Sequence, residues 1–391
     1  MPEHWNNWSG SQQHDLARYE LPTDEAQLRS ILQTASKNGQ IVRTVGSGHS
    51  FVPFWTDDVI VSLDNMKGLI ECDESTRSAT FWAGTKLHEM GDVLWDHGLS
   101  IENMGDIDRQ SIAGAISTGT HGTGATLSNI PSQLRALTIM KADGETVTLS
   151  QQSDAELFRA AQVSMGTLGI ITKVTFELSP AYYLHEKNWN CSVEECDRQR
   201  EALIKDNRHW EFFWDPASDT CAMKTLNLTE ESSQRRIDDS QEVGRNYRIL
   251  PSNREHKFNE TEFSVPAEFG WECFMAIRQL MQTKFPEVKW PLEYRTLAAD
   301  DMLISSASGR DSVTISAHQG SQYPHEAFFL EVENIFRRYQ GRPHWGKVHS
   351  YKKLDLQKVY PQFDRFCEIR DQFDPEGRFL NPFLRGIFCD A

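Results

Sequence analysis

Residues 111–124, with the sequence SIAGAISTGTHGTG, carry almost no bulky side chain. This segment limits the fold more than any other, because glycine, serine and threonine cannot supply bulk to a hydrophobic core. It can instead line a ligand closely with backbone N–H groups and hydroxyls. Taken alone, such a stretch is equally typical of an ordinary loop. A ligand-lining role therefore needs support from a second feature of the chain.

A second glycine-containing turn, Gly46–Ser47–Gly48–His49, directly follows a short β-branched strand predicted over Ile41–Val45. Two glycines after a strand let the backbone approach a ligand, and consecutive N–H groups can form an anion-binding nest. The third glycine of the G-x-G-x-x-G pattern is absent, and residues 51–55 (FVPFW) do not open a helix. The chain also lacks a Walker A loop. The turn therefore indicates a ligand site that is neither a Rossmann site nor a P-loop.

Together, the two segments resemble the flavin-holding segments of the vanillyl-alcohol-oxidase-type FAD family, most closely its aldonolactone and alditol oxidase branch. Residues 165–170 (MGTLGI) and 342–347 (RPHWGK) match that branch in the same order along the chain. The resemblance implies an α+β fold, with a two-subdomain FAD-binding domain at residues 1–179 and a substrate-binding domain at residues 180–391. The second domain would hold a large antiparallel sheet flanked by helices, and its C-terminal segment would return to the flavin.

The resemblance also implies how FAD is held. His49 matches the histidine that is joined covalently to the 8α-carbon of the flavin in this branch. No cysteine lies near Gly166–Gly169, where doubly linked relatives carry a second attachment, so a single histidyl bond is implied. The implied cofactor-binding positions are Arg43, Thr44, Val45, Gly46, Ser47, Gly48, His49, Ser50, Gly105, Asp106, Ser111, Gly114, Thr118, Gly119, Thr120, His121, Gly122, Ile170 and His344.

Polar residues recur at alternate positions of two otherwise apolar strands in the second half of the chain. Residues i and i+2 of a strand project from the same face, so each strand can present two polar groups to one cavity. The two strands are predicted over Pro291–Leu297, with Glu293 and Arg295, and over Ser312–His318, with Ser316 and His318.

The resemblance assigns roles to these residues. Arg295 and Lys347 would grip substrate oxygens, and either His318 or Glu293 would be the base that accepts the hydroxyl proton. Asp106, where alditol oxidases carry a serine, and Ser316 would complete the substrate contacts. Simpler readings stay open: an ion pair between strand neighbours, a core histidine at position 318, and a surface lysine at position 347.

The substrate side of the chain looks more like the lactone-oxidising members, because of His318–Gln319 and residues 342–349 (RPHWGKVH). We therefore expect oxidation of an aldono-1,4-lactone of the gulono, galactono or arabinono type. Hydride would pass to flavin N5 and oxygen would be reduced to hydrogen peroxide, since Gly105 stands where glycine admits oxygen in this family. The alternatives are an alditol oxidase of the xylitol or sorbitol type, a lactone dehydrogenase using a cytochrome or quinone, and a non-catalytic flavin-binding protein.

Composition excludes several other classes of function. A formal net charge of −16 argues against nucleic acids and anionic membranes as partners. The sequence contains no run of about 18 apolar residues, and its first ten residues do not resemble a signal peptide. Seven scattered cysteines favour free thiols in a reducing cytoplasm. His344 and His349 have no third ligand at suitable spacing, so we expect no metal. Oligomeric state stays open.

Periodicity and turn signals predict the remaining elements. A charged stretch at residues 229–246 is predicted to be a solvated loop, and residues 210–214 (WEFFW) to pack in the core. Helices are expected at residues 22–38, Lys86–Asp96, 266–283 (opened by Pro266) and 325–339, strands at Val59–Leu63, Ala79–Ala83 and Leu168–Leu178, and a hairpin at residues 134–149 around Asp143–Gly144.

Overall fold

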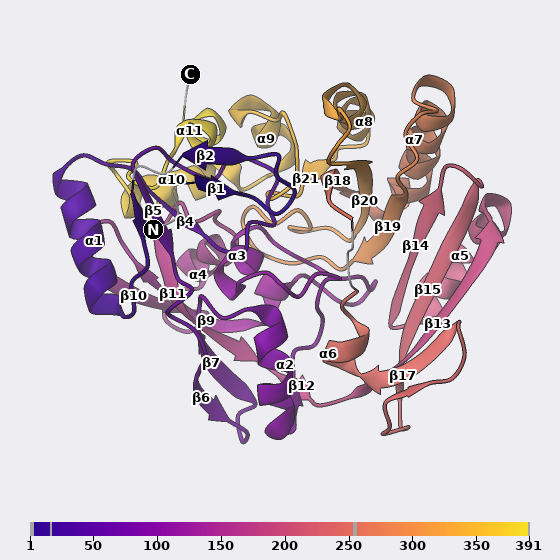
Figure 1. Ribbon diagram of the computed structural model, residues 1–391, viewed down its shortest axis with the longest axis horizontal. Coiled ribbons are helices and arrows are strands. Elements are labelled where there is room, and N and C mark those ends of the chain that lie inside the picture. Colours follow the sequence, from indigo (N-terminus) through magenta and orange to yellow (C-terminus); the bar gives the residue numbers. More distant parts are fainter. Residues whose placement is uncertain (1–3, 16–17, 253–255, 390–391) are drawn as a thin grey trace.

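The computed structural model describes residues 4–15, 18–252 and 256–389 (Figure 1). Within these residues, a three-stranded and a five-stranded sheet lie in the N-terminal half, and a nine-stranded sheet lies in the C-terminal half. This is the predicted α+β architecture, with a large antiparallel sheet flanked by helices.

The three-stranded sheet is parallel and has the order β3 (Tyr19–Glu20), β5 (Val59–Ser62), β4 (Val42–Val45). Helix α1 (Glu25–Lys37) joins β3 to β4. Its first turn is fixed by Asp24, whose carboxylate accepts a hydrogen bond from the Gln27 N–H at 2.8 Å. Asp24 is therefore the N-cap, and the helix lies within the predicted range of residues 22–38.

The five-stranded sheet is antiparallel and contains the predicted hairpin. Its order is β10 (Thr146–Ser150), β9 (Leu134–Met140), β11 (Ile170–Glu177), β7 (Ser78–Trp82), β6 (Leu69–Asp73). The helices of this region are α2 (Leu87–Asp96), α3 (Ile112–Ser117) and α4 (Ala155–Gln162). The small residues of α3 let it pack closely against this sheet, where Ile112, Ala115 and Ile116 are buried.

The nine-stranded sheet is antiparallel throughout and occupies the right side of Figure 1. Its order is β16 (Arg235–Arg236), β17 (Gln241–Arg245), β13 (Tyr183–Ser192), β15 (Thr220–Thr229), β14 (His209–Asp215), β19 (Leu292–Leu297), β20 (Ser312–Gly320), β18 (Phe258–Pro266), β21 (Arg342–Pro343). The charged stretch at residues 229–246 was predicted to be a solvated loop, but part of it is a strand. β17 pairs with β13 and buries Val243. Pro266 ends β18, opposite Ser312, and is also the N-cap of the 3₁₀ turn Ala267–Phe269, which leads directly into helix α7 (Gly270–Lys284). The helix predicted over residues 266–283 is therefore present, with its α-helical part beginning at Gly270.

The two faces of this sheet differ in character because side chains alternate along each strand. One face packs against α5 (Val193–Asp206), α7 (Gly270–Lys284) and α8 (Glu326–Arg338). Trp210, Phe212 and Trp214 belong to this buried aromatic layer, which confirms the predicted core role for these three of the residues 210–214. The opposite face carries polar and charged side chains and is turned toward the N-terminal half.

The C-terminal segment crosses back to the N-terminal half through α9 (Lys353–Val359), α10 (Phe363–Phe373) and α11 (Pro382–Phe388), drawn in yellow in Figure 1. Asn381 donates hydrogen bonds of 2.7 Å to the carbonyls of Pro53 and Trp55, just beyond the His49 turn. It also caps α11 through the Leu384 N–H, at 3.0 Å.

Shorter elements complete the described chain: β1 (His4–Asn6), β2 (Gln13–Asp15), β8 (Leu99–Ser100), β12 (Ser179–Pro180), α6 (Asn246–Ile249) and 3₁₀ turns at Ile130–Gln133 and Ala267–Phe269. The chain passes from one half to the other near β12, while the domain boundary at residues 179 and 180 stays a prediction. The seven cysteines are free thiols. Among the described helices, none combines the length and apolar character needed to cross a membrane.

Candidate functional site

A cleft of about 1020 Å³ lies between the two N-terminal sheets, and both glycine-containing segments line it. The segments approach so closely that a Cβ on Gly46 would lie 2.2 Å from the Ser111 Oγ. Gly48 has a φ of 72°, a left-handed conformation that favours glycine. Predicted cofactor residues that line the cleft are Arg43, Thr44, Val45, Gly46, Ser47, Gly48, His49, Ser50, Ser111, Gly114 and Thr118.

The chemistry of this cleft fits a flavin nucleotide. Backbone N–H groups of the His49 turn and the hydroxyls of Ser47, Ser111 and Thr118 suit phosphate and ribityl oxygens, while Val52 and Phe54 offer apolar surface for a ring system. A Cβ on Gly84 would lie 1.9 Å from the Leu63 carbonyl oxygen, so at this position only a glycine backbone can form the cleft wall. The residues present thus fit the FAD that the sequence predicts.

Arg43 is buried in the cleft wall, where it connects several segments by hydrogen bonds. Its guanidinium donates to the carbonyls of Phe54 at 3.0 Å, Met165 at 2.8 Å and Phe379 at 2.8 Å. Burial lowers the pKa of Arg43 to about 10, so the group is still charged at neutral pH. It joins β4 to the C-terminal segment and to the loop before β11.

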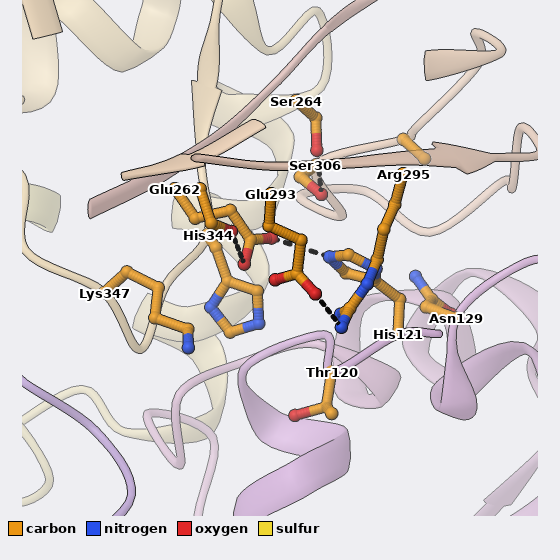
Figure 2. A network of polar contacts seen from close by, with 12 residues as sticks. Thr120, His121, Asn129, Glu262, Ser264, Glu293, Arg295, Ser306, His344 and Lys347 are labelled. Atoms are coloured by element: carbon orange, nitrogen blue, oxygen red, sulfur yellow. Dashed lines mark hydrogen bonds and ion pairs between the residues drawn. The ribbon is translucent and has the colours of Figure 1, made fainter. Parts of the chain in front are cut away.

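A second, more polar cavity of about 590 Å³ adjoins the cleft and shares His49, Ser50, Gln110 and Thr118 with it. Figure 2 shows Glu293, Arg295, His344 and Lys347 reaching toward Thr120 of the N-terminal half. The lining combines residues of both halves: His49, Ser50, Gly105, Asp106, Ile107, Gln110, Thr118, Thr120, His121, Phe258, Glu260, Glu262, Glu293, Arg295, His318, His344, Gly346 and Lys347.

Arg295 is the most heavily paired charge in this cavity. Its Nη2 lies 2.9 Å from Asp106 Oδ2 and also pairs with Glu293, while its Nε donates to Glu211 Oε2 at 3.0 Å. Burial alone would lower its pKa, but these three carboxylates hold the pKa of Arg295 well above its usual value. The guanidinium is therefore a permanent cation.

Lys347 and His318 meet at Glu260. The Lys347 ammonium pairs with Glu260 Oε2 and lies 5.2 Å from the centre of the Phe51 ring. The His318 Nε2 lies 3.7 Å from Glu260 Oε1, and its Nδ1 lies 2.9 Å from the Pro291 carbonyl. Because a carbonyl only accepts hydrogen bonds, Nδ1 of a neutral His318 carries the hydrogen and Nε2 is the basic nitrogen.

Three acidic residues at this site were not predicted from the sequence: Glu260 and Glu262 of β18 and Glu211 of β14. Glu260 lies opposite His318 and Glu262 opposite Ser316 in the register of β18 and β20. The signal was present, because Glu260 and Glu262 show the same alternation that pointed to the neighbouring strands.

His121 and Glu262 form a buried pair, with Nε2 and Oε1 2.7 Å apart (Figure 2). The other nitrogen of His121 faces the Gly122 carbonyl at 2.8 Å, so both ring nitrogens face acceptors. Burial opposes ionisation of Glu262, yet its pairing with His121 contributes to a pKa well below the usual value. The two acceptors hold the His121 ring in one orientation beside Glu262.

His344 lies near this pair, its ring centre 5.9 Å from that of His121. The trio of His121, Glu262 and His344 has ligand atoms close enough together for a metal ion, a grouping that spacing along the chain did not reveal. However, two of the possible ligand atoms are already engaged: His344 Nδ1 accepts the Gly346 N–H at 3.1 Å, and Glu262 pairs with His121. A metal ion would have to displace these contacts. Burial lowers the pKa of His344 to about 4.

His49 lines the cleft and the polar cavity alike, and its ring centre lies 5.6 Å from that of Trp8. Burial, together with the charges of Lys347 and Lys86, lowers the pKa of His49 to about 4. Its imidazole is therefore neutral at physiological pH and keeps the nitrogen lone pair that a covalent bond to carbon needs.

Four predicted site residues line neither cavity. Ser316 lies behind the polar cavity, where its hydroxyl donates to Glu262 at 3.0 Å. Ile170 points into the core, and its neighbour Ile171 lines the cleft because successive strand residues face opposite sides. Gly119 and Gly122 shape the loop instead: a Cβ on Gly122 would lie 2.4 Å from the Met104 carbonyl.

Comparison with known proteins gives two family matches. Residues 174–242 and 228–387 match the D-arabinono-1,4-lactone oxidase family, and residues 17–150 match the FAD binding domain family. The chain is 33% identical to an L-gulono-1,4-lactone dehydrogenase of Mycobacterium tuberculosis, over 98% of each chain. It is 27% identical to an L-gulonolactone oxidase of Mus musculus, again over 98% of each chain.

Solved structures show the same fold at low sequence identity. A cholesterol oxidase from B. sterolicum superposes with a TM-score of 0.86 at 14% identity, covering 99% of this chain and 96% of that one. A chitooligosaccharide oxidase superposes with a TM-score of 0.77 at 13% identity, covering 96% and 93%.

Proposed function

Since the chain belongs to the D-arabinono-1,4-lactone oxidase family, we propose that it oxidises an aldono-1,4-lactone at the ring carbinol beside the carbonyl. It is an FAD-dependent oxidoreductase, and the finer points of substrate, acceptor and flavin attachment belong to this proposal. When bound, FAD would take a hydride at N5 and pass the electrons to oxygen, giving hydrogen peroxide.

The observation that carries the proposal is the convergence of Arg295, Lys347 and His318 on a cavity that shares His49 with the flavin-fitting cleft. Oxidation of a carbinol needs a base for the hydroxyl proton and cations for the developing alkoxide. We assign the base to His318, whose Nδ1 bond to the Pro291 carbonyl leaves Nε2 as the basic nitrogen. Glu293 pairs with Arg295 and is better suited to orienting that guanidinium.

We propose oxygen as the electron acceptor because of Gly105, which lines the polar cavity. A Cβ at this position would lie 2.8 Å from the His121 carbonyl, so alanine would force the two segments apart or narrow the cavity. A lactone dehydrogenase is the second candidate, since the Mycobacterium tuberculosis relative carries that name. An alditol oxidase is less favoured. Alditol oxidases carry a substrate-contacting serine at the position of Asp106, and here the Asp106 carboxylate is paired with Arg295.

We propose further that FAD is attached covalently through His49. The neutral imidazole at the junction of the cleft and the polar cavity supports this attachment. In His49→Ala, flavin colour should be released by acid precipitation, whereas in the wild type it should stay with the pellet. His97→Ala, a partly exposed histidine paired with Glu74, is the control and should behave as the wild type.

The decisive experiment is a panel of aldono-1,4-lactones and alditols with oxygen consumption, peroxide formation and artificial dye reduction measured in parallel. We expect one peroxide per lactone oxidised and little activity with alditols. Dye reduction without peroxide would replace the oxidase by the dehydrogenase. Activity confined to alditols would overturn the lactone assignment.

A further inference from the structure

Lys224 lies on β15, on the polar face of the nine-stranded sheet, and it lines neither cavity. It stands opposite Glu211 of β14, and its Nζ lies 3.1 Å from Glu211 Oε1. A second carboxylate, Glu186 of β13, lies 3.9 Å from the same ammonium. The lysine side chain is 15% exposed, so this cation has been taken almost wholly out of water.

Glu211 connects Lys224 to the substrate cavity. Its other oxygen, Oε2, accepts a hydrogen bond of 3.0 Å from the Arg295 Nε, and the two residues are register partners on β14 and β19. The Glu211 side chain is 2% exposed. One buried carboxylate thus bridges two cations, of which only Arg295 faces the cavity.

The balance of charge around Arg295 requires this second cation. Asp106, Glu211 and Glu293 all contact one guanidinium, so three carboxylates share a single positive charge. Buried carboxylates without a matching cation are strongly destabilised or take up protons. Without Lys224, Glu211 would compete with the other two carboxylates for Arg295, and the direction of the guanidinium would no longer be fixed.

We propose that Lys224 is a positioning residue, which acts through Glu211 to fix the Nε edge of Arg295 and so aims its Nη groups at the substrate cavity. The inference rests on the proposed function, in which Arg295 grips substrate oxygens. It adds two residues, Lys224 and Glu211, from strands outside those that form the cavity wall.

The test compares Lys224→Met with Lys224→Arg in the flavin-loaded enzyme. We expect Lys224→Met to lower kcat at least tenfold with KM changed less than threefold, because the alkoxide is stabilised mainly in the transition state. The acidic limb of the pH profile should move upward by at least half a unit, since the remaining carboxylates protonate more readily with one cation fewer. Lys224→Arg should keep kcat within threefold of the wild type.

Lys173→Met is the matched control. Lys173 also sits on a strand and pairs with a partly buried carboxylate, Glu25, at 2.8 Å, but it lies outside both cavities. It should leave kcat and the pH profile unchanged. The proposal is overturned if Lys224→Met keeps the wild-type kcat and pH profile, or if Lys224→Arg is as impaired as Lys224→Met while both retain the wild-type flavin content.

If Lys224→Met does not fold, the double variant Glu211→Gln/Lys224→Met removes the buried carboxylate together with its cation. It should fold and still show a kcat at least tenfold below the wild type; a wild-type kcat would overturn the proposal.

A measurement independent of turnover separates this proposal from the proposed function. The Arg295 Nε–H signal in a nitrogen-15 NMR spectrum can be assigned by its absence from the spectrum of Arg295→Lys. This signal should be sharp in the wild type and in Lys224→Arg. It should be broadened or shifted in Lys224→Met. An unchanged signal in Lys224→Met would overturn the positioning role, even if no lactone proved to be a substrate.

Discussion

At the scale of single residues, the chemistry of the cavity depends on which nitrogen of each histidine carries hydrogen. His318 Nδ1 faces a carbonyl, so in the neutral ring Nδ1 carries the hydrogen and Nε2 is an acceptor. His344 Nδ1 accepts a backbone N–H, so Nε2 of that ring carries the hydrogen and is a donor. His121 has acceptors on both sides. His318 is therefore suited to accept a proton at Nε2, His344 to donate a hydrogen bond from Nε2, and His121 to bridge two acceptors.

His318→Gln tests the assignment of the base. We expect the rate of flavin reduction by lactone to fall by roughly 100- to 10,000-fold, the usual contribution of a general base. The rate should also lose the pH dependence that ionisation of the base gives it. Anaerobic stopped-flow absorbance measures both quantities.

Ser316→Ala is the companion variant, since Ser316 lies on the same strand but does not line the cavity. It should keep the rate of flavin reduction within about threefold of the wild type, as expected for loss of one hydrogen bond to Glu262. If His318→Gln keeps the wild-type rate and pH dependence while Glu293→Gln loses its pH dependence, the base is Glu293 instead.

At the scale of elements, the sequence predicted those strands in which apolar alternation was clear. The strands around Glu293 and His318 were found, and with them three cavity residues, Glu293, Arg295 and His318. The strand β18 was not predicted although it alternates in the same way, because Pro266 at its end favours a helix start. The strand β17 was not predicted because charged residues surround Val243. Cross-strand neighbours such as Glu211 and Arg295 depend on strand order, which local patterns do not contain.

The C-terminal helices offer a prediction about how separate elements hold the flavin site together. Asn381 caps α11 and donates two hydrogen bonds to the loop that follows the His49 turn. Asn381→Ala removes the cap and both bonds, which together should cost about 2–4 kcal/mol of unfolding free energy. Urea unfolding measures this loss, and flavin content at a fixed FAD concentration should fall with it. Unchanged stability would mean that the C-terminal segment does not support this loop.

At the scale of the whole molecule, the site lies where the two halves meet. The N-terminal sheets supply the cleft and His49, and the polar face of the nine-stranded sheet supplies Arg295, His318 and the carboxylates. The motifs implied both sets of residues, but the junction itself depends on contacts between segments far apart in the chain. The bond from Arg43 to the Phe379 carbonyl is one of them.

This arrangement buries several histidines in their neutral form, and the fold should therefore be sensitive to acid. Burial lowers the pKa of His209 to about 3, of His344 to about 4 and of His349 to about 3. Both His349 nitrogens are buried and, among the described residues, have no hydrogen-bond partner. Between the unfolded pKa of about 6.5 and these folded values, the unfolded chain binds protons that the native chain does not. The unfolding free energy is therefore retained above pH 6.5 and falls as the pH drops below it.

His349→Phe tests this expectation, because the phenyl ring suits the aromatic surroundings of Trp345 and Phe383, whose ring centres lie 6.1 and 5.9 Å from that of His349. Removing the histidine should flatten the pH dependence of unfolding free energy between pH 6.5 and 4 by about 1.4 kcal/mol per pH unit. Urea denaturation at a series of pH values measures that slope. His97→Ala, at the protein surface, should leave the slope unchanged. An equal slope in His349→Phe and the wild type would mean that His349 is not held neutral by the fold, and acid sensitivity would then have to come from other groups, such as His209 and His344.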